Sequence, residues 1–219
     1  MKVYLGGTFD PVHNGHTHLA QELVSELDID ELYLMPCYRA VHKGSVAASV
    51  SQRLDMLKLA VKPFSKLLID DREIKQGGPS YTYETLSSIR DEEHEGGVSF
   101  VIGTDSLLSF SNWFNASRIH SLANLIVVDR PASSFKLSEE DLVEERTASI
   151  EKLEALGFSL LQDGEKLTEY RSGKVLVLKL SLYDISSTEI RSLVKDRKKI
   201  THLVGNDVAE YIQKHNLYQ

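Results

Sequence analysis

Two histidines, His13 and His16, stand three residues apart in a segment that carries two adjacent glycines. The segment follows a short apolar run and precedes apolar residues at helical spacing, so it is expected to turn from a strand into a helix. Backbone amides at such a turn can face phosphate oxygens, and glycine permits close approach. Two imidazoles at the helix start can bind a polyphosphate and support the charge that develops during group transfer. The full segment reads Gly6-Gly7-Thr8-Phe9-Asp10-Pro11-Val12-His13-Asn14-Gly15-His16.

The same two histidines have plainer explanations. They could be surface or capping residues, or half of a metal site, and a bare His-x-x-His favours these interpretations. A catalytic zinc site usually needs a third protein ligand, and no companion cluster stands out in the sequence. The strand-turn-helix context favours phosphate binding, and no metal held by protein side chains is predicted. His18 is interpreted as an ordinary helix residue.

A second candidate anion site lies far downstream, in Ile185-Ser186-Ser187-Thr188-Glu189-Ile190-Arg191. Hydroxyl groups and amides at a helix start, with Arg191 one turn further on, can hold an anion. Taken alone, the segment is most simply a capping box, because Glu189 follows Ser186 by three residues. Paired with the first motif, it indicates a second contact to the same polyphosphate.

Short apolar runs alternate with amphipathic stretches, which predicts an α/β fold with a doubly wound, mostly parallel sheet. The length of 219 residues favours a single domain, 1–219. Strands are predicted at 3–5, 31–35, 67–69, 99–103, 125–128, 158–161 and 175–180. Helices are predicted near 19–27, from Ser51 as N-cap, and at 83–90, 150–156, 188–194 and 208–215.

Composition excludes several functions. A formal net charge of −7 argues against broad binding to nucleic acid or anionic membranes, so a polyanionic ligand must meet a local basic site. The single cysteine, Cys37, rules out an internal disulfide and a cysteine-based zinc cluster. The sequence has no signal-peptide pattern and no run of membrane-spanning length, so the expected location is the cytoplasm.

Together the motifs resemble those of the nicotinate (or nicotinamide) mononucleotide adenylyltransferases, members of the nucleotidyltransferase α/β superfamily with a Rossmann-like fold. The resemblance covers nearly the whole chain and its motifs occur in order. It implies transfer of the adenylyl group of ATP to nicotinate mononucleotide, giving nicotinate adenine dinucleotide and pyrophosphate in NAD biosynthesis. Besides the two segments above, it rests on His42-Lys43, Gln52-Arg53-Leu54-Asp55-Met56-Leu57, Pro79-Ser80-Tyr81-Thr82, Phe100-Val101-Ile102-Gly103-Thr104-Asp105 with Trp113 downstream, and Val128-Asp129-Arg130-Pro131.

The resemblance also implies roles for single residues. The catalytic set is His13, His16 and Arg191, which would contact the ATP phosphates. The ATP site would also include Gly6, Gly7, Thr8, Phe9, Gly103, Asp105, Ser187 and Thr188, with the Asp105 carboxylate accepting hydrogen bonds from ribose hydroxyls. The C-terminal helical part, from about 185 to 219, would complete this site. The acceptor would be bound by His42, Lys43, Thr82, Trp113 and Arg130, with the indole stacking on the pyridine ring.

Several of these residues have structural alternatives. Lys43 could be a solvated loop lysine, Thr82 a helix cap and Asp105 a helix N-cap. By composition alone Trp113 would be a core residue, and Arg130 could lie in a surface turn before Pro131.

The acceptor phosphate is mostly dianionic near neutral pH, since its second pKa is about 6, so no protein general base is required. Magnesium would bridge the phosphates through water and substrate oxygens, and no covalent enzyme intermediate is expected. Alternatives are nicotinamide mononucleotide or dual specificity, a phosphopantetheine adenylyltransferase, a class I aminoacyl-tRNA synthetase fragment and a non-catalytic nucleotide sensor. The sequence leaves the choice of nicotinate or nicotinamide open, and a homo-oligomer is possible.

Overall fold

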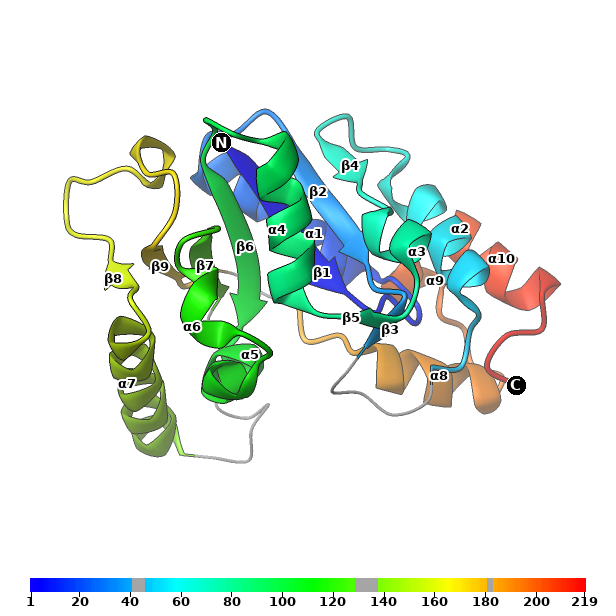
Figure 1. Ribbon diagram of the computed structural model, residues 1–219. Helices are drawn as coiled ribbons and strands as arrows, with labels where there is room; N and C mark the ends of the chain where they lie inside the picture. The colour runs from blue at the N-terminus through cyan, green and yellow to red at the C-terminus, as the bar shows by residue number, and fades with distance from the viewer. Residues whose placement is uncertain (41–45, 129–137, 181–182) are drawn as a thin grey trace. The chain divides into compact units, whose positions relative to one another are not determined.

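The computed structural model describes residues 1–40, 46–128, 138–180 and 183–219 (Figure 1). The chain divides into two compact units. The first unit consists of Met1–Leu5 with Tyr81–Leu180, and the second of Gly6–Ser80 with Ser181–Gln219. Each unit therefore combines an early and a late segment of the chain.

The first unit is built on parallel strands that read as apolar runs in the sequence. The runs in β6 and β7 are almost entirely buried, as expected for strands covered on both faces. Its strands are β1 (Lys2–Gly7), of which the first four residues belong to this unit, β6 (Val98–Gly103), β7 (Asn124–Val128), β8 (Ser159–Leu160) and β9 (Lys174–Leu178). All pairings between these strands are parallel. Its helices are α4 (Thr82–Glu92), α5 (Thr104–Ser109), η1 (Phe110–Asn112), α6 (Ala116–Ile119), α7 (Glu139–Ala155) and η3 (Leu167–Glu169).

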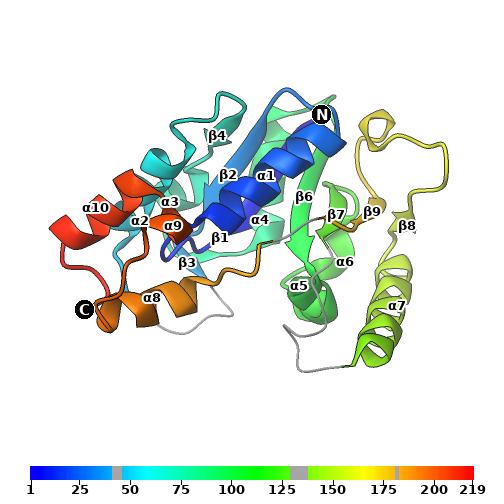
Figure 2. The same cartoon turned by 180° about the vertical axis from the view of Figure 1, so that it is seen from behind.

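The second unit contains β2 (Leu32–Pro36) paired in parallel with β4 (Leu67–Ile69), and a small parallel pair of β3 (Arg39–Ala40) and β5 (Pro79–Ser80). Figures 1 and 2 both show α10 beside α2, where Tyr211 donates a hydrogen bond to Asp55 at 3.1 Å. The helices of this unit are α1 (Asn14–Glu26), α2 (Val50–Val61), α3 (Arg72–Gln76), α8 (Ser187–Lys195), α9 (Thr201–Val204) and α10 (Asn206–Lys214).

Strand β1 takes part in both units. Its first residues pair with β6, and its last residue, Gly7, accepts a backbone hydrogen bond from Cys37 just beyond β2. Within the first unit the strand order is β1-β6-β7-β9-β8, and in the second unit β2 pairs with β4. The predicted α/β class with a parallel sheet and flanking helices is confirmed, whereas the single domain 1–219 stays a prediction.

Two helix boundaries differ from the sequence prediction. Helix α2 is capped by Ser49 and not by Ser51, because Ser49 and Gln52 form a reciprocal capping box that requires this three-residue spacing. Helix α7 begins at Glu139, eleven residues before the predicted start at Ile150. Its added turns are rich in charged, exposed side chains and so carry little apolar periodicity.

None of the helices in the described ranges combines the length and the apolar character that a membrane span requires.

Candidate active site

The first motif forms the turn between β1 and α1. Phe9 adopts a left-handed backbone conformation with φ of +50° and is only 2% exposed. Its ring packs on Gly7, where a Cβ atom would lie 2.8 Å from Phe9 Cζ, and its edge meets the His16 ring at a centroid distance of 4.9 Å. Position 7 therefore requires glycine, because a larger residue would displace the Phe9 ring that supports His16.

The two histidines lie together at the start of α1. His13 is the N-cap residue and is 7% exposed, while His16 occupies the third helical position. Their ring centroids are 3.7 Å apart, and the backbone N–H of His13 donates to His16 Nδ1 at 3.2 Å. Because Nδ1 accepts this bond, neutral His16 carries its proton on Nε2. His16 is thus set to donate a hydrogen bond from Nε2.

Asp10 holds several segments of the second unit together. Its buried carboxylate accepts hydrogen bonds from the backbone N–H groups of Ala47 (2.8 Å) and Ala48 (3.0 Å) and from the hydroxyl of Tyr218 (2.8 Å). Arg191 Nη1 lies 4.0 Å from the same carboxylate. The hydrogen bonds to Asp10 therefore attach two distant segments to the first motif, one that contains Ala47 and Ala48 and one that contains Tyr218.

The second motif contacts the first directly. Ser186 caps α8 by accepting from the N–H of Glu189, as a capping residue would. Ser187 Oγ donates to the carbonyl of Pro11 at 2.9 Å. Arg191 Nη1 donates to the carbonyl of Asp10 at 2.7 Å, and Nη2 donates to Thr188 Oγ1 at 3.1 Å. The segment is therefore more than a capping box, because it joins the turn that bears the histidines.

Arg53, which belongs to the motif from Gln52 to Leu57, also supports this turn. It lies on α2, is 1% exposed, and donates to the carbonyls of Thr8 (2.7 Å), Cys37 (2.8 Å) and Tyr38 (3.0 Å). A sequence signal existed, because Arg53 stands on the same helical face as the apolar Met56 and Leu57. A cation on a buried face must find buried acceptors.

Tyr218, the penultimate residue, was not anticipated at all. Its bond to Asp10 depends on the path of the C-terminal segment, which no local pattern encodes. Burial raises the pKa of Tyr218 well above its ordinary value, and the adjacent Asp10 carboxylate raises it further.

We expect Tyr218→Phe to lower the free energy of unfolding by about 1–2 kcal/mol at neutral pH, because a hydrogen bond to a carboxylate is lost. The folded-state pKa is raised, so this contribution is fully present below the ordinary pKa of 10.0 and is lost as pH rises above it, where the unfolded tyrosine ionises. In urea unfolding, the difference in the free energy of unfolding between wild type and variant should be smaller at pH 10.5 than at pH 8. The control is Tyr183→Phe, at a side chain that is 54% exposed; a gap that does not change with pH would contradict the argument.

A second expected result concerns Gly7. Gly7→Ala should destabilise the protein by about 1–3 kcal/mol, since the new methyl group must displace the buried Phe9 ring. It should also lower activity, because the ring supports His16. Thermal unfolding and a rate assay measure both effects. Gly96→Ala, whose Cβ would meet nothing closer than 3.4 Å, is the matched control; equal effects of the two substitutions would refute the packing role.

The remaining described candidates belong to the first unit. Gly103 ends β6 and caps α5, and Asp105 follows in the first turn of α5 as an exposed residue, so the helix N-cap is Gly103 and not Asp105. Thr82 is the first residue of α4, and its N-cap is Tyr81.

Trp113 is half-buried and its ring lies 5.0 Å from Phe110, a core residue. Its neighbour Phe114 is 46% exposed and lies 4.9 Å from the ring of Tyr81, which precedes Thr82. The Thr82 and Trp113 segments are thus brought together in one aromatic cluster.

Three predicted acceptor residues, His42, Lys43 and Arg130, lie outside the described residues. Within the described ranges, no group of three or more His, Cys, Asp or Glu side chains is placed to hold a metal ion. The absence of a metal held by the protein stays a prediction.

The chain is similar to known proteins over most of its length. Residues 4–193 match the family model described as cytidylyltransferase-like. A protein of Legionella pneumophila (strain Corby), named "Probable nicotinate-nucleotide adenylyltransferase", is 36% identical over 214 residues, covering 98% of this chain and 97% of the relative. One of Marinomonas sp. (strain MWYL1) with the same name is 36% identical over 216 residues, covering 98% and 93%.

Among solved structures, the Plasmodium falciparum nicotinic acid mononucleotide adenylyltransferase complexed with NaAD matches with a TM-score of 0.72 at 18% identity, over 99% of this chain and 96% of that one. At this identity the match supports the fold alone. The sequence matches establish that the chain belongs to the cytidylyltransferase-like family and, within it, to the nicotinate-nucleotide adenylyltransferases.

Proposed function

We propose that this protein transfers the adenylyl group of ATP to nicotinate mononucleotide, giving nicotinate adenine dinucleotide and pyrophosphate, as a step of NAD biosynthesis. The observation that carries the proposal is the junction of two anion-binding motifs, in which Arg191 and Ser187 of α8 donate to the carbonyls of Asp10 and Pro11 in the histidine turn. The names of relatives that match over nearly the full chain support the same substrates.

His13, His16 and Arg191 are the proposed catalytic residues. His16 would donate from Nε2 to a phosphate oxygen, because its Nδ1 is held by the backbone N–H of His13. Arg191 is a fixed cation one turn into α8, since one of its amino groups is held by the carbonyl of Asp10. These groups need no rearrangement as negative charge moves toward the leaving pyrophosphate, and such preorganised donors lower the barrier.

The chemistry is an in-line substitution at the α-phosphorus of ATP. An oxygen of the acceptor phosphate forms the new P–O bond while the bond to the bridging oxygen of pyrophosphate breaks. The attacking phosphate is already ionised at neutral pH, so no side chain has to remove a proton. The work of the chain is to align the two substrates and to neutralise the departing charge.

Magnesium would enter with ATP as part of the substrate. The carboxylate of the histidine turn, Asp10, accepts hydrogen bonds from two backbone amides and from the hydroxyl of Tyr218. The described part of the chain thus suits a cation held by phosphate oxygens and water, which supplies further neutralisation of the phosphate charge.

The remaining ATP and acceptor contacts are proposals as well. Gly6, Gly7, Thr8 and Phe9 would lie along the phosphates, with Ser187 and Thr188, and Asp105 beside Gly103 would take a ribose hydroxyl. The pyridine ring would stack on Trp113 near Thr82, while His42, Lys43 and Arg130 would face the acceptor phosphate. We also propose that the protein is located in the cytoplasm and forms a homo-oligomer.

The test is a rate assay with ATP, magnesium and either nicotinate or nicotinamide mononucleotide at matched concentrations, following dinucleotide and pyrophosphate. A much higher kcat/KM with nicotinate mononucleotide supports the proposal. Comparable rates would mean dual specificity. No product from either acceptor, with ATP still bound, would overturn the proposed acceptor.

A further inference from the structure

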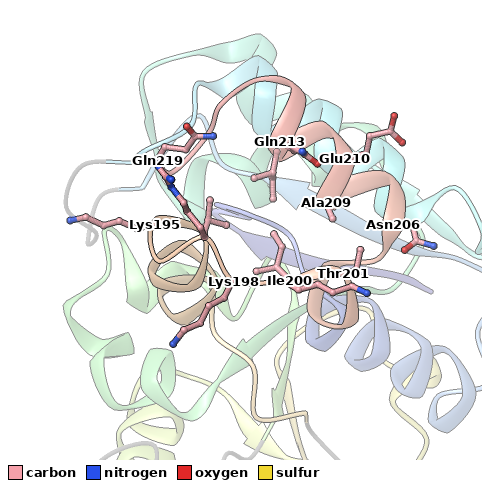
Figure 3. Close-up of a pocket in the computed structure, with 13 residues that line it drawn as sticks. Lys195, Lys198, Ile200, Thr201, Asn206, Ala209, Glu210, Gln213 and Gln219 are labelled. Atoms are coloured by element: carbon pink, nitrogen blue, oxygen red, sulfur yellow. The ribbon is translucent and has the colours of Figure 1, made fainter.

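The C-terminal segment, residues 215–219, ends beside the helix that carries Arg191. Gln219 and the last turn of α8, at Val194 and Lys195, border one cavity of the second unit (Figure 3). The side chain of Gln219 is exposed, and an exposed polar side chain holds a chain end only weakly. The position of the segment next to α8 therefore depends on the residues just before Gln219.

The backbone of this segment directs Tyr218 toward the histidine turn. Helix α10 is followed by a Schellman motif, in which Asn216 is left-handed at φ of +51° and the N–H of the buried Leu217 bonds to the carbonyl of Ile212. Tyr218 is left-handed as well, at φ of +64°, a conformation that bulky side chains rarely adopt. Such a conformation persists only where other contacts impose it, and here the contact is the 2.8 Å hydrogen bond to Asp10.

Asp10 connects Tyr218 to Arg191 through two different groups. Its carbonyl oxygen accepts from Arg191 Nη1 at 2.7 Å. Its carboxylate accepts from the Tyr218 hydroxyl and from the backbone N–H groups of Ala47 and Ala48. The same Arg191 Nη1 lies 4.0 Å from carboxylate oxygen Oδ2, which is beyond hydrogen-bond distance. Arg191 is thus bonded to the carbonyl of Asp10 but not to its carboxylate.

The donors on the Asp10 carboxylate determine where the guanidinium lies. An ionised carboxylate can accept about four hydrogen bonds, and the Tyr218 hydroxyl with the two amides supplies three. A buried carboxylate that loses a donor has to replace it, and the Arg191 cation stands 4.0 Å away. Loss of the Tyr218 hydroxyl would therefore draw the guanidinium onto the carboxylate. A guanidinium paired in this way has fewer N–H groups and less charge to offer a phosphate.

We propose that Tyr218 is a positioning residue for adenylyl transfer. By occupying the Asp10 carboxylate, its hydroxyl keeps the Arg191 guanidinium where it can face the departing pyrophosphate. The inference rests on the proposed function, which assigns Arg191 to that group. Tyr218 acts through Asp10 and needs no contact with either substrate. Its effect belongs to the chemical step, because the charge on the leaving group is greatest in the transition state.

The experiment is a kinetic double-mutant cycle with ATP, magnesium and nicotinate mononucleotide, run well below the melting temperature of every variant. Tyr218→Phe is expected to lower kcat about tenfold and to change KM for ATP less than about twofold, because a displaced guanidinium stabilises the transition state less. In the Arg191→Ala background the same substitution should change kcat less than about twofold, since no guanidinium remains to be positioned. ATP labelled at the α-phosphate keeps the slow turnover of Arg191→Ala measurable.

Tyr211→Phe is the matched control. It removes another tyrosine hydroxyl that donates to a carboxylate in the same unit, at 3.1 Å from Asp55, and should leave kcat within about twofold of wild type. An unchanged kcat for Tyr218→Phe, or an equal loss with and without Arg191, would overturn this inference and leave the proposed function intact. A wild type that makes no dinucleotide from either acceptor would instead overturn the proposed function, and this inference with it.

Discussion

Replacing His16 by alanine is expected to lower kcat/KM for dinucleotide formation roughly 10²- to 10³-fold, which corresponds to about 3–4 kcal/mol of transition-state stabilisation. The reason is geometric. The backbone N–H of His13 holds Nδ1, and the edge of the Phe9 ring packs against the imidazole, so Nε2 is a preorganised donor. A fixed donor is worth more in the transition state than a mobile one, because no reorganisation accompanies the movement of charge.

The loss should fall mainly on kcat, and the free energy of unfolding should fall by only about 0.5–1.5 kcal/mol, because His16 is partly exposed and loses one hydrogen bond from the His13 N–H. His18→Ala is the matched control. It lies on the same helix, stacks on Tyr183 and faces Glu22 at 3.5 Å, away from the proposed phosphate contacts. If His16→Ala and His18→Ala reduce the rate equally, His16 has no special role in the transfer.

Arg53→Met should be the most destabilising single substitution proposed for this chain, lowering the free energy of unfolding by at least about 3 kcal/mol. Methionine fills a similar volume but leaves the carbonyls of Thr8, Cys37 and Tyr38 without their buried donor. Each unsatisfied buried acceptor costs about 1–3 kcal/mol. Activity should fall as well, since Thr8 lies in the turn that bears the histidines.

Urea unfolding measures the effect. Lys58→Met on the same helix is the control, because its side chain is 60% exposed and its pairing with Asp55, at 4.0 Å, is weak. If Arg53→Met lowers the free energy of unfolding by less than about 1 kcal/mol, water replaces the guanidinium as the donor. The proposed role of Arg53 in holding the turn would then be wrong.

Local features of the fold were largely predictable. The apolar runs of β6 and β7, the strand-turn-helix at His13 and His16, and the helix at 188–194 all follow from periodicity and capping chemistry over a few residues. Errors arose where the periodic signal was weak, as in the charged first turns of α7, or where two serines competed as caps, as at Ser49 and Ser51.

The sequence by itself determined the fold class and the family, and it located the two motifs that are proposed to bind ATP, because these features depend on residue types at short spacings. Only the tertiary structure decided that Asp10 joins the histidine turn to Ala47, Arg191 and Tyr218, and that Arg53 is buried beneath it. Such contacts link residues up to 208 positions apart, and packing, not local propensity, selects them.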